Sequence, residues 1–221
     1  MRRVVVFSLA SFLALSVAAF AQDYKIEATK GPAGGDVSQA VQNALQPQGQ
    51  QLLDSSGKTL CEIWLNKDLT PAQSPDTSPD VLYGKIAQGS LVGVINFPEA
   101  TKDYRGQAIK AGYYTLRYEL IPQDGNHMGV SQYRDFLLLM PAAKDTDPSK
   151  LLSFNDAVKL SRDSTNTGHP GVMLMDQVSD TNKTFPALFQ DYSQNWALQV
   201  QAPLGGQELP LAIVLVGQYQ G

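Results

Sequence analysis

The sequence predicts a mainly β protein, an antiparallel β-sandwich with one or two short helices. Short stretches of alternating or wholly apolar residues recur along the chain, and turns rich in glycine and proline separate them. Only two segments have the apolar spacing of a helix, and both are short. The chain also lacks the regular alternation of strands and helices that builds a parallel sheet.

The first 21 residues have the pattern of a secretory signal peptide. Arg2 and Arg3 precede a long apolar run that ends in an Ala-Phe-Ala triplet at residues 19–21, which is an A-x-A cleavage signal. We therefore expect a secreted or periplasmic protein in which residues 22–221 form a single β-sandwich domain. We expect no stable insertion in a membrane after cleavage.

The net charge limits which partners the protein is expected to bind, and the cysteine content limits how the fold can be stabilised. Loss of residues 1–21 reduces Lys and Arg from 17 to 15 against 21 Asp and Glu, which leaves a net charge of −6. A mildly acidic chain without a basic run is not expected to bind nucleic acid. Cys61 is the only cysteine, so no disulfide forms within the chain, and its alternation with apolar neighbours predicts a buried position.

The N-terminal third contains an edge strand, a helix and a hairpin. Residues 24–28 alternate as an edge strand does, and Asp36 is the predicted N-cap of a short amphipathic helix. Residues 50–65 form two strands around a turn in which Gly57 supplies the positive φ. The proline-rich residues 67–80 are predicted to be a mobile surface loop.

The middle of the chain has the strongest β signals. A β-branched run at residues 90–97 is followed by an alternating strand at residues 112–121 and by an apolar strand at residues 135–141. The alternation places Arg117 and Glu119 on the wetter face, where they would form a surface charge pair. The connection before residue 135 carries an Asp-Gly-Asn turn and is predicted to be a hairpin loop.

The last third predicts one more helix and three more strands. Ser153 is the expected N-cap of the helix. The strands lie at residues 171–178, 195–201 and 211–219, and the last of these is apolar on both faces, which is typical of a central strand.

Most catalytic signatures are absent, so the sequence names no catalytic residue. It contains no G-x-S-x-G elbow, H-E-x-x-H motif, phosphate-binding glycine loop or C-x-x-C pair. A carboxylate-dependent hydrolase is an alternative, because such an enzyme needs only two facing acids. The acids that qualify are Asp103, Glu119, Asp124, Asp135 and Asp176.

Copper binding is a second alternative. His127 and His169 are the two histidines, and methionines lie near both of them. Imidazole and thioether groups are ligands that copper favours. The spacing does not match a blue-copper loop, however, so we expect no cofactor unless the two histidines meet in space.

The aromatic residues favour binding without catalysis. Trp64, Tyr104, Tyr113 and Tyr133 could form a partly exposed platform for a sugar or a peptide, although Trp64 fits a core position at least as well. Arg134 and Asp135 interrupt a strand that is otherwise apolar. The predicted ligand-binding residues are His127, Tyr133, Arg134 and Asp135.

The stretch from Arg105 to Pro122 resembles a motif of secreted bacterial β-sandwich proteins that are classed as a domain of unknown function. Gly106, Ala111, Gly112, Tyr114 and Leu116 carry the resemblance to the A-G-x-Y-x-L hairpin of these proteins. The resemblance implies a hairpin that leads into a core strand, and it implies no activity.

Together these observations predict a secreted or periplasmic binding module, or an envelope-accessory protein, without catalysis. Its expected partner is a protein or a glycan.

Overall fold

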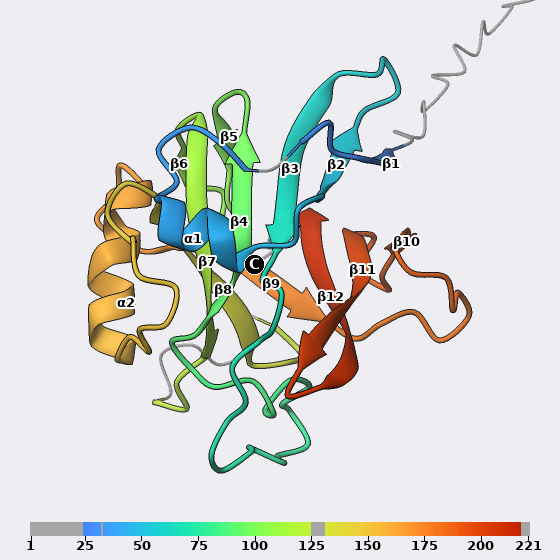
Figure 1. The fold of residues 1–221 in the computed structure, drawn as a ribbon. Helices are drawn as coiled ribbons and strands as arrows, with labels where there is room; N and C mark the ends of the chain where they lie inside the picture. Colours follow the sequence, from blue (N-terminus) through green and yellow to red (C-terminus); the bar gives the residue numbers. More distant parts are fainter. Residues whose placement is uncertain (1–23, 32, 125–130, 218–221) are drawn as a thin grey trace, which may run out of the picture.

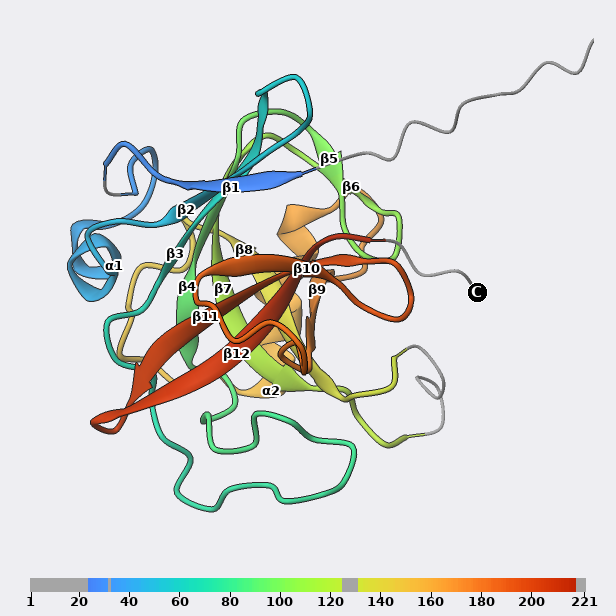
Figure 2. The same cartoon turned by 90° about the vertical axis from the view of Figure 1, so that its right-hand side faces the viewer.

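A computed structural model describes residues 24–31, 33–124 and 131–217. Ten strands form one sheet, nearly closed into a barrel, in which all neighbours are antiparallel (Figures 1 and 2). In sheet order the strands are β1 (Lys25–Ala28), β2 (Gln50–Leu53), β3 (Thr59–Leu65), β4 (Leu91–Phe97), β7 (Gly112–Leu120), β8 (Asp135–Pro141), β9 (Gly171–Asp176), β12 (Gln207–Val216), β11 (Trp196–Leu204) and β10 (Ala187–Gln190). The predicted mainly β, antiparallel class is therefore confirmed, and its long strands all belong to one curled sheet.

The two edges of the sheet approach each other. β1 contacts β10, and the ring of Tyr24 meets the ring of Trp196 edge to face at a centroid distance of 5.5 Å. A twisted sheet of this size tends to curl, and the curl brings its two edge strands close together.

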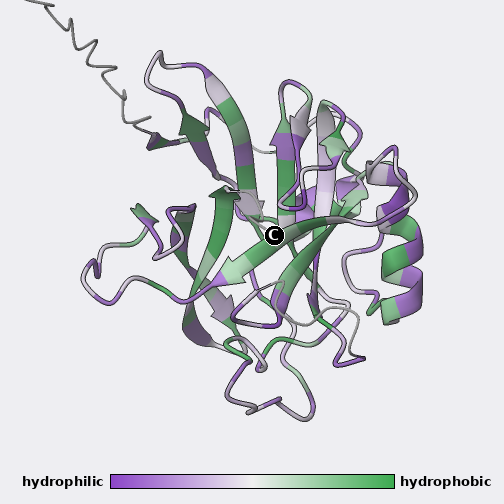
Figure 3. Cartoon of the chain, turned by 180° about the vertical axis from the view of Figure 1, so that it is seen from behind, coloured by the Kyte–Doolittle hydropathy of each residue, from purple (hydrophilic) through white to green (hydrophobic). Residues whose placement is uncertain are grey.

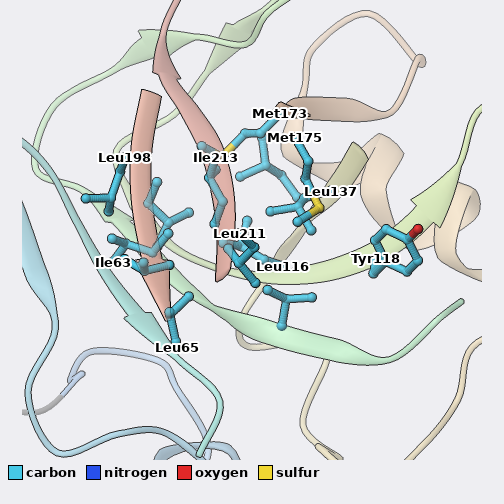
Figure 4. Packing of buried hydrophobic residues seen from close by; sticks show 14 of the residues in the cluster. Ile63, Leu65, Leu116, Tyr118, Leu137, Met173, Met175, Leu198, Leu211 and Ile213 are labelled. Carbon is cyan, nitrogen blue, oxygen red and sulfur yellow. The ribbon is translucent and has the colours of Figure 1, made fainter. Parts of the chain in front are cut away.

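The interior of the barrel is filled with apolar side chains from nearly all of its strands (Figure 4). The labelled residues of this cluster are Ile63, Leu65, Leu116, Tyr118, Leu137, Met173, Met175, Leu198, Leu211 and Ile213. Cys61 belongs to the same cluster, and burial raises the pKa of its thiol to about 12, so it stays protonated. Its predicted burial is confirmed.

Two helices cover the outside of the sheet. α1 (Gln39–Ala44) lies over Trp64, which is buried and donates its indole N–H to the carbonyl of Gly31 at 3.0 Å. The N-cap of α1 is Ser38, which accepts a hydrogen bond from Val41, so the prediction of Asp36 as the cap was wrong. Trp64 is a core residue and belongs to no exposed platform.

The second helix, α2 (Phe154–Ser161), packs on the outer face of β8. Ser153 caps it as predicted, and a 3-10 turn (Arg162–Ser164) continues it. A small hairpin of β5 (Thr101–Lys102) and β6 (Ala108–Ile109) stands beside the barrel. Figure 3 shows mainly hydrophobic central strands and mainly hydrophilic loops.

The outer face of β7 is not wet, so the predicted surface pair of Arg117 and Glu119 was wrong. Arg117 is fully buried and forms a bidentate pair with Asp145, at 2.8 and 2.7 Å. It also donates to the carbonyls of Gly89, Lys150 and Asp147. The segment between β8 and α2 covers this face, and the alternation along β7 alone does not reveal that cover.

Candidate functional site

The structure describes three of the four residues of the predicted binding site, and it assigns different roles to them. His127 lies outside the described residues. Tyr133, Arg134 and Asp135 lie at the start of β8 or just before it, but they face different surroundings.

Asp135 fastens a distant segment to the core. It is fully buried, and its carboxylate accepts hydrogen bonds from the backbone N–H groups of Leu82 and Tyr83, each at 2.8 Å. It also accepts the hydroxyl of Tyr118 at 2.6 Å. Burial, and then the charge of Asp135, raises the pKa of Tyr118. Because the described partners occupy both oxygens, Asp135 has a structural role here.

Arg134 holds the same segment from the outside. Its Nε donates to the carbonyl of Ile121 at 2.9 Å, and its backbone N–H donates to the carbonyl of Asp80 at 2.9 Å. The carboxylates of Asp76 and Asp80 lie 3.7 and 3.9 Å from its guanidinium. Arg134 thus anchors part of the proline-rich loop at residues 67–80, and the mobility of that loop stays a prediction.

Tyr133 faces a pocket of about 380 Å³, which we name the tyrosine pocket. It opens between the end of β9, the loop that follows, and the turn between β10 and β11. Its lining residues are Gln132, Tyr133, Asp176, Gln177, Val178, Ser179, Asp180, Thr181, Phe189, Gln190, Asp191 and Tyr192. Aromatic rings, carboxyl groups and amides predominate, and this lining includes no lysine or arginine.

Buried polar side chains fix the two loops of the tyrosine pocket. Gln199, fully buried on β11, donates to the carbonyls of Asn182 and Thr184 and accepts the N–H of Ser179. Across the turn after β10, both carboxylate oxygens of Asp191 accept hydrogen bonds from Asn195, at 2.8 and 2.7 Å. The pocket is therefore preformed by its own scaffold.

Two carboxyl groups meet inside the tyrosine pocket. Asp176, the last residue of β9, lies close enough to Asp191 for the two side chains to interact. Burial raises the pKa of Asp176, and the charge of Asp191 raises it further. Burial and the neighbouring carboxylate therefore both favour the protonated form of Asp176.

Hydrogen bonds orient the phenol of Tyr133. Its hydroxyl donates to Oε1 of Gln177 at 3.0 Å and accepts the amide of Gln132 at 3.2 Å. The side-chain amide of Gln177 also donates a hydrogen bond to the carboxylate of Asp180, at 3.4 Å. Tyr192, at the other side of the pocket, is fully exposed, with a relative accessibility of 103%. The pocket thus offers one oriented phenol and one freely accessible ring.

The other acids named from the sequence serve different purposes. Asp103 is buried and accepts four hydrogen bonds, which hold the β5–β6 turn against β9. Glu119 is 1% exposed, and neither of its carboxyl oxygens has a hydrogen-bond partner in the described part of the chain. Burial raises the pKa of Glu119 to about 7. Of the named acids, only Asp176 lines the tyrosine pocket.

The predicted copper ligand His169 is exposed and lines a different pocket, beside α2. Within the described ranges, no group of three or more His, Cys, Asp and Glu side chains is arranged to hold a metal ion. Because His127 lies outside the described residues, the copper hypothesis stays a prediction.

The sequence did not reveal Asp191 and Tyr192. They belong to the turn after β10. The alternation did not predict this strand, because the strand has only four residues and none of them is fully buried. A signal was present, however, because Asp191 and Asn195 bracket a polar stretch in the way that turn residues do.

No protein-family model, curated protein or solved structure matches the chain. The resemblance of residues 105–122 to secreted proteins of unknown function therefore stays a prediction. Among the residues that the structure describes, no helix is long and apolar enough to cross a membrane.

Proposed function

We propose that the protein is an exported, non-catalytic module that binds a neutral or amino sugar in the tyrosine pocket. One observation carries this proposal: the exposed ring of Tyr192 and the phenol of Tyr133 share a pocket with acids and amides. The N-terminal pattern of a signal peptide supports a secreted or periplasmic location, where glycans are accessible.

Each part of the lining suits a sugar. The polarised C–H groups on one face of a pyranose ring pack well on the negative face of an aromatic ring such as Tyr192. Carboxylate and amide groups accept and donate the hydrogen bonds of sugar hydroxyls. Three acids in the lining, without a lysine or arginine, repel anionic sugars and attract amino sugars.

The contact between Asp176 and Asp191 favours binding over glycoside hydrolysis. Retaining glycosidases hold their two carboxyl groups about 5 Å apart, and inverting enzymes hold them farther apart, because substrate or water must fit between them. Asp176 and Asp191 lie close enough for their side chains to interact, which leaves little such space.

Calorimetric titration of residues 22–221 with soluble glycans tests this proposal. Chitosan and neutral oligosaccharides are expected to bind, whereas oligouronates of the same length are not. Tyr192→Ala should weaken binding at least tenfold, because it removes the stacking surface. Leu151→Ala is the matched control, because Leu151 is the other large exposed apolar side chain among the described residues and lies outside the pocket. Equal binding of oligouronates, or an unchanged affinity in Tyr192→Ala, would refute the proposal.

A hydrolase that uses the Asp176–Asp191 pair is the second candidate. Two acids that share one proton can activate a water molecule, as in aspartic proteases, where one pKa of the pair is raised. Product formation from glycans and peptides between pH 4 and 7 tests this candidate. Turnover that Asp176→Asn abolishes would establish hydrolysis, and binding without turnover would support the module.

A further inference from the structure

A second pocket of about 380 Å³, which we name the helix pocket, lies between α2 and the outer face of β8 and β9. It has no part in the proposed sugar site. Its lining residues are Tyr104, Arg105, Ile121, Pro122, Phe136, Leu138, Phe154, Val158, Arg162, His169, Pro170, Val172 and Leu174. The floor is formed by buried side chains of the sheet, and one wall by half-buried side chains of α2.

The charged lining of the helix pocket has one sign. Arg105 and Arg162 line it together with His169, and this lining includes no carboxylate. Neither arginine has an ion-pair partner within the described ranges, and both are exposed. The acid nearest to Arg162 in sequence, Asp163, is already paired with Lys144 at 2.8 Å. The acid nearest to Arg105, Asp103, is buried and accepts four hydrogen bonds from N–H groups of other residues and of the Arg105 backbone. The two guanidinium groups are therefore free to meet an anion.

Hydrogen bonds bring the three cationic or basic groups together. The β5–β6 turn carries Arg105, and the nearby Gln107 donates to the carbonyl of Pro170 at 3.0 Å. Thr165, which follows the 3-10 turn that begins at Arg162, donates to the carbonyl of His169 at 2.5 Å. The segments that carry Arg105, Arg162 and His169 thus converge on one side of the pocket.

We propose that the helix pocket binds a single-chain carboxylate amphiphile, such as a medium-chain fatty acid. The apolar floor would hold the hydrocarbon chain, and the two arginines would hold the carboxylate, which guanidinium groups bind in a bidentate manner. Its volume falls within the range of small-molecule sites, which are mostly apolar with a few converging polar groups. A cationic amphiphile of equal length is repelled by the same groups.

Calorimetric titration with decanoate, below the concentration at which it forms micelles, tests the site. Decanoate should bind in a one-to-one ratio, and decyltrimethylammonium, which has the same chain length, should not. The double variant Arg105→Gln/Arg162→Gln should bind decanoate at least tenfold more weakly. Lys159→Gln is the matched control, because it removes one exposed positive charge from α2 outside the lining.

A second variant tests the apolar part of the site. Val158→Trp fills the pocket from α2 and should abolish decanoate binding, while circular dichroism checks the fold. Tyr192→Ala should leave decanoate binding unchanged. The decanoate site and the proposed sugar site are therefore tested independently, and one proposal can be refuted while the other stands. Equal binding of decyltrimethylammonium, or full affinity in the double arginine variant, would overturn the proposal.

Discussion

The guanidinium group of Arg117 and the carboxylate of Asp145 form a buried ion pair, with Nη2 and Oδ1 2.7 Å apart. Arg117 is fully buried and Asp145 is 5% exposed, and Thr115 donates a further hydrogen bond to the same carboxylate at 2.6 Å. The pair fastens the segment between β8 and α2 to the outer face of β7.

Removal of one partner of this pair should be more harmful than removal of both. Asp145→Ala leaves the buried guanidinium without its carboxylate, so we expect a loss of about 3–5 kcal/mol in the free energy of unfolding. Arg117→Met combined with Asp145→Ala should lose less than Asp145→Ala alone, because no uncompensated charge remains buried. Urea denaturation of Asp145→Ala, Arg117→Met and the double variant measures these losses. A double variant that loses the sum of the single losses would contradict this account.

Glu119 should make stability depend on pH near neutrality. Its pKa is raised from 4.5 to about 7, so the folded protein holds this proton more tightly than the unfolded chain. The resulting stabilisation is complete below pH 4.5 and is lost as the pH rises to about 7, with a slope of at most about 1.4 kcal/mol per pH unit. Glu119→Met should remove most of this slope and stabilise the protein at pH 8. Thermal unfolding at pH 5, 6, 7 and 8 provides the test, and a slope that the substitution leaves unchanged would argue against it.

Asp176 should contribute to the same trend in a smaller way. Burial and then Asp191 raise its pKa, so its contribution to stability is present below its ordinary pKa and is lost as the pH rises. Asp176→Asn keeps a hydrogen-bond donor toward Asp191 and removes the repulsion, so it should stabilise the protein at pH 7 relative to pH 4. Nuclear magnetic resonance titration of the Asp176 carboxyl carbon measures its pKa directly. An ordinary value would contradict this prediction.

Asp135 should be far more important for folding than for ligand binding. Asp135→Ala leaves the N–H groups of Leu82 and Tyr83 without an acceptor, so we expect a loss of about 2–4 kcal/mol of stability. Sugar affinity should be unchanged at temperatures where the variant is folded, because Asp135 does not line the tyrosine pocket. Limited proteolysis should then cut preferentially within residues 67–90. Protection equal to that of the wild type would show that Asp135 does not anchor this segment.

Local patterns predicted most of the fold. Alternation and apolar runs located the long strands. Ser153 was correctly predicted as the N-cap of α2, and Gly57 has the positive φ, 86°, that was predicted for the turn of the first hairpin. The wrong predictions depended on contacts distant in sequence. Arg117 was placed in water because the cover from Asp145 to Lys150 is not visible in the strand that it protects.

The candidate site was less predictable for the same reason. Tyr133 and Asp176 were named separately from the sequence, but their meeting in one pocket depends on the pairing of β8, β9, β12 and β11. Asp191 and Tyr192 escaped notice because β10 is an edge strand, where half-buried residues lack a clear alternation.

The most direct test of the sugar-binding account is a nuclear magnetic resonance titration of residues 22–221 with chitotriose and its deacetylated form. We expect the largest shift changes at the amides of Tyr133, Gln177, Asp191 and Tyr192, with little change around α2. The account would be contradicted if saturable shift changes occurred only at amides outside the tyrosine pocket. It would also be contradicted if millimolar sugar caused no shift changes at all.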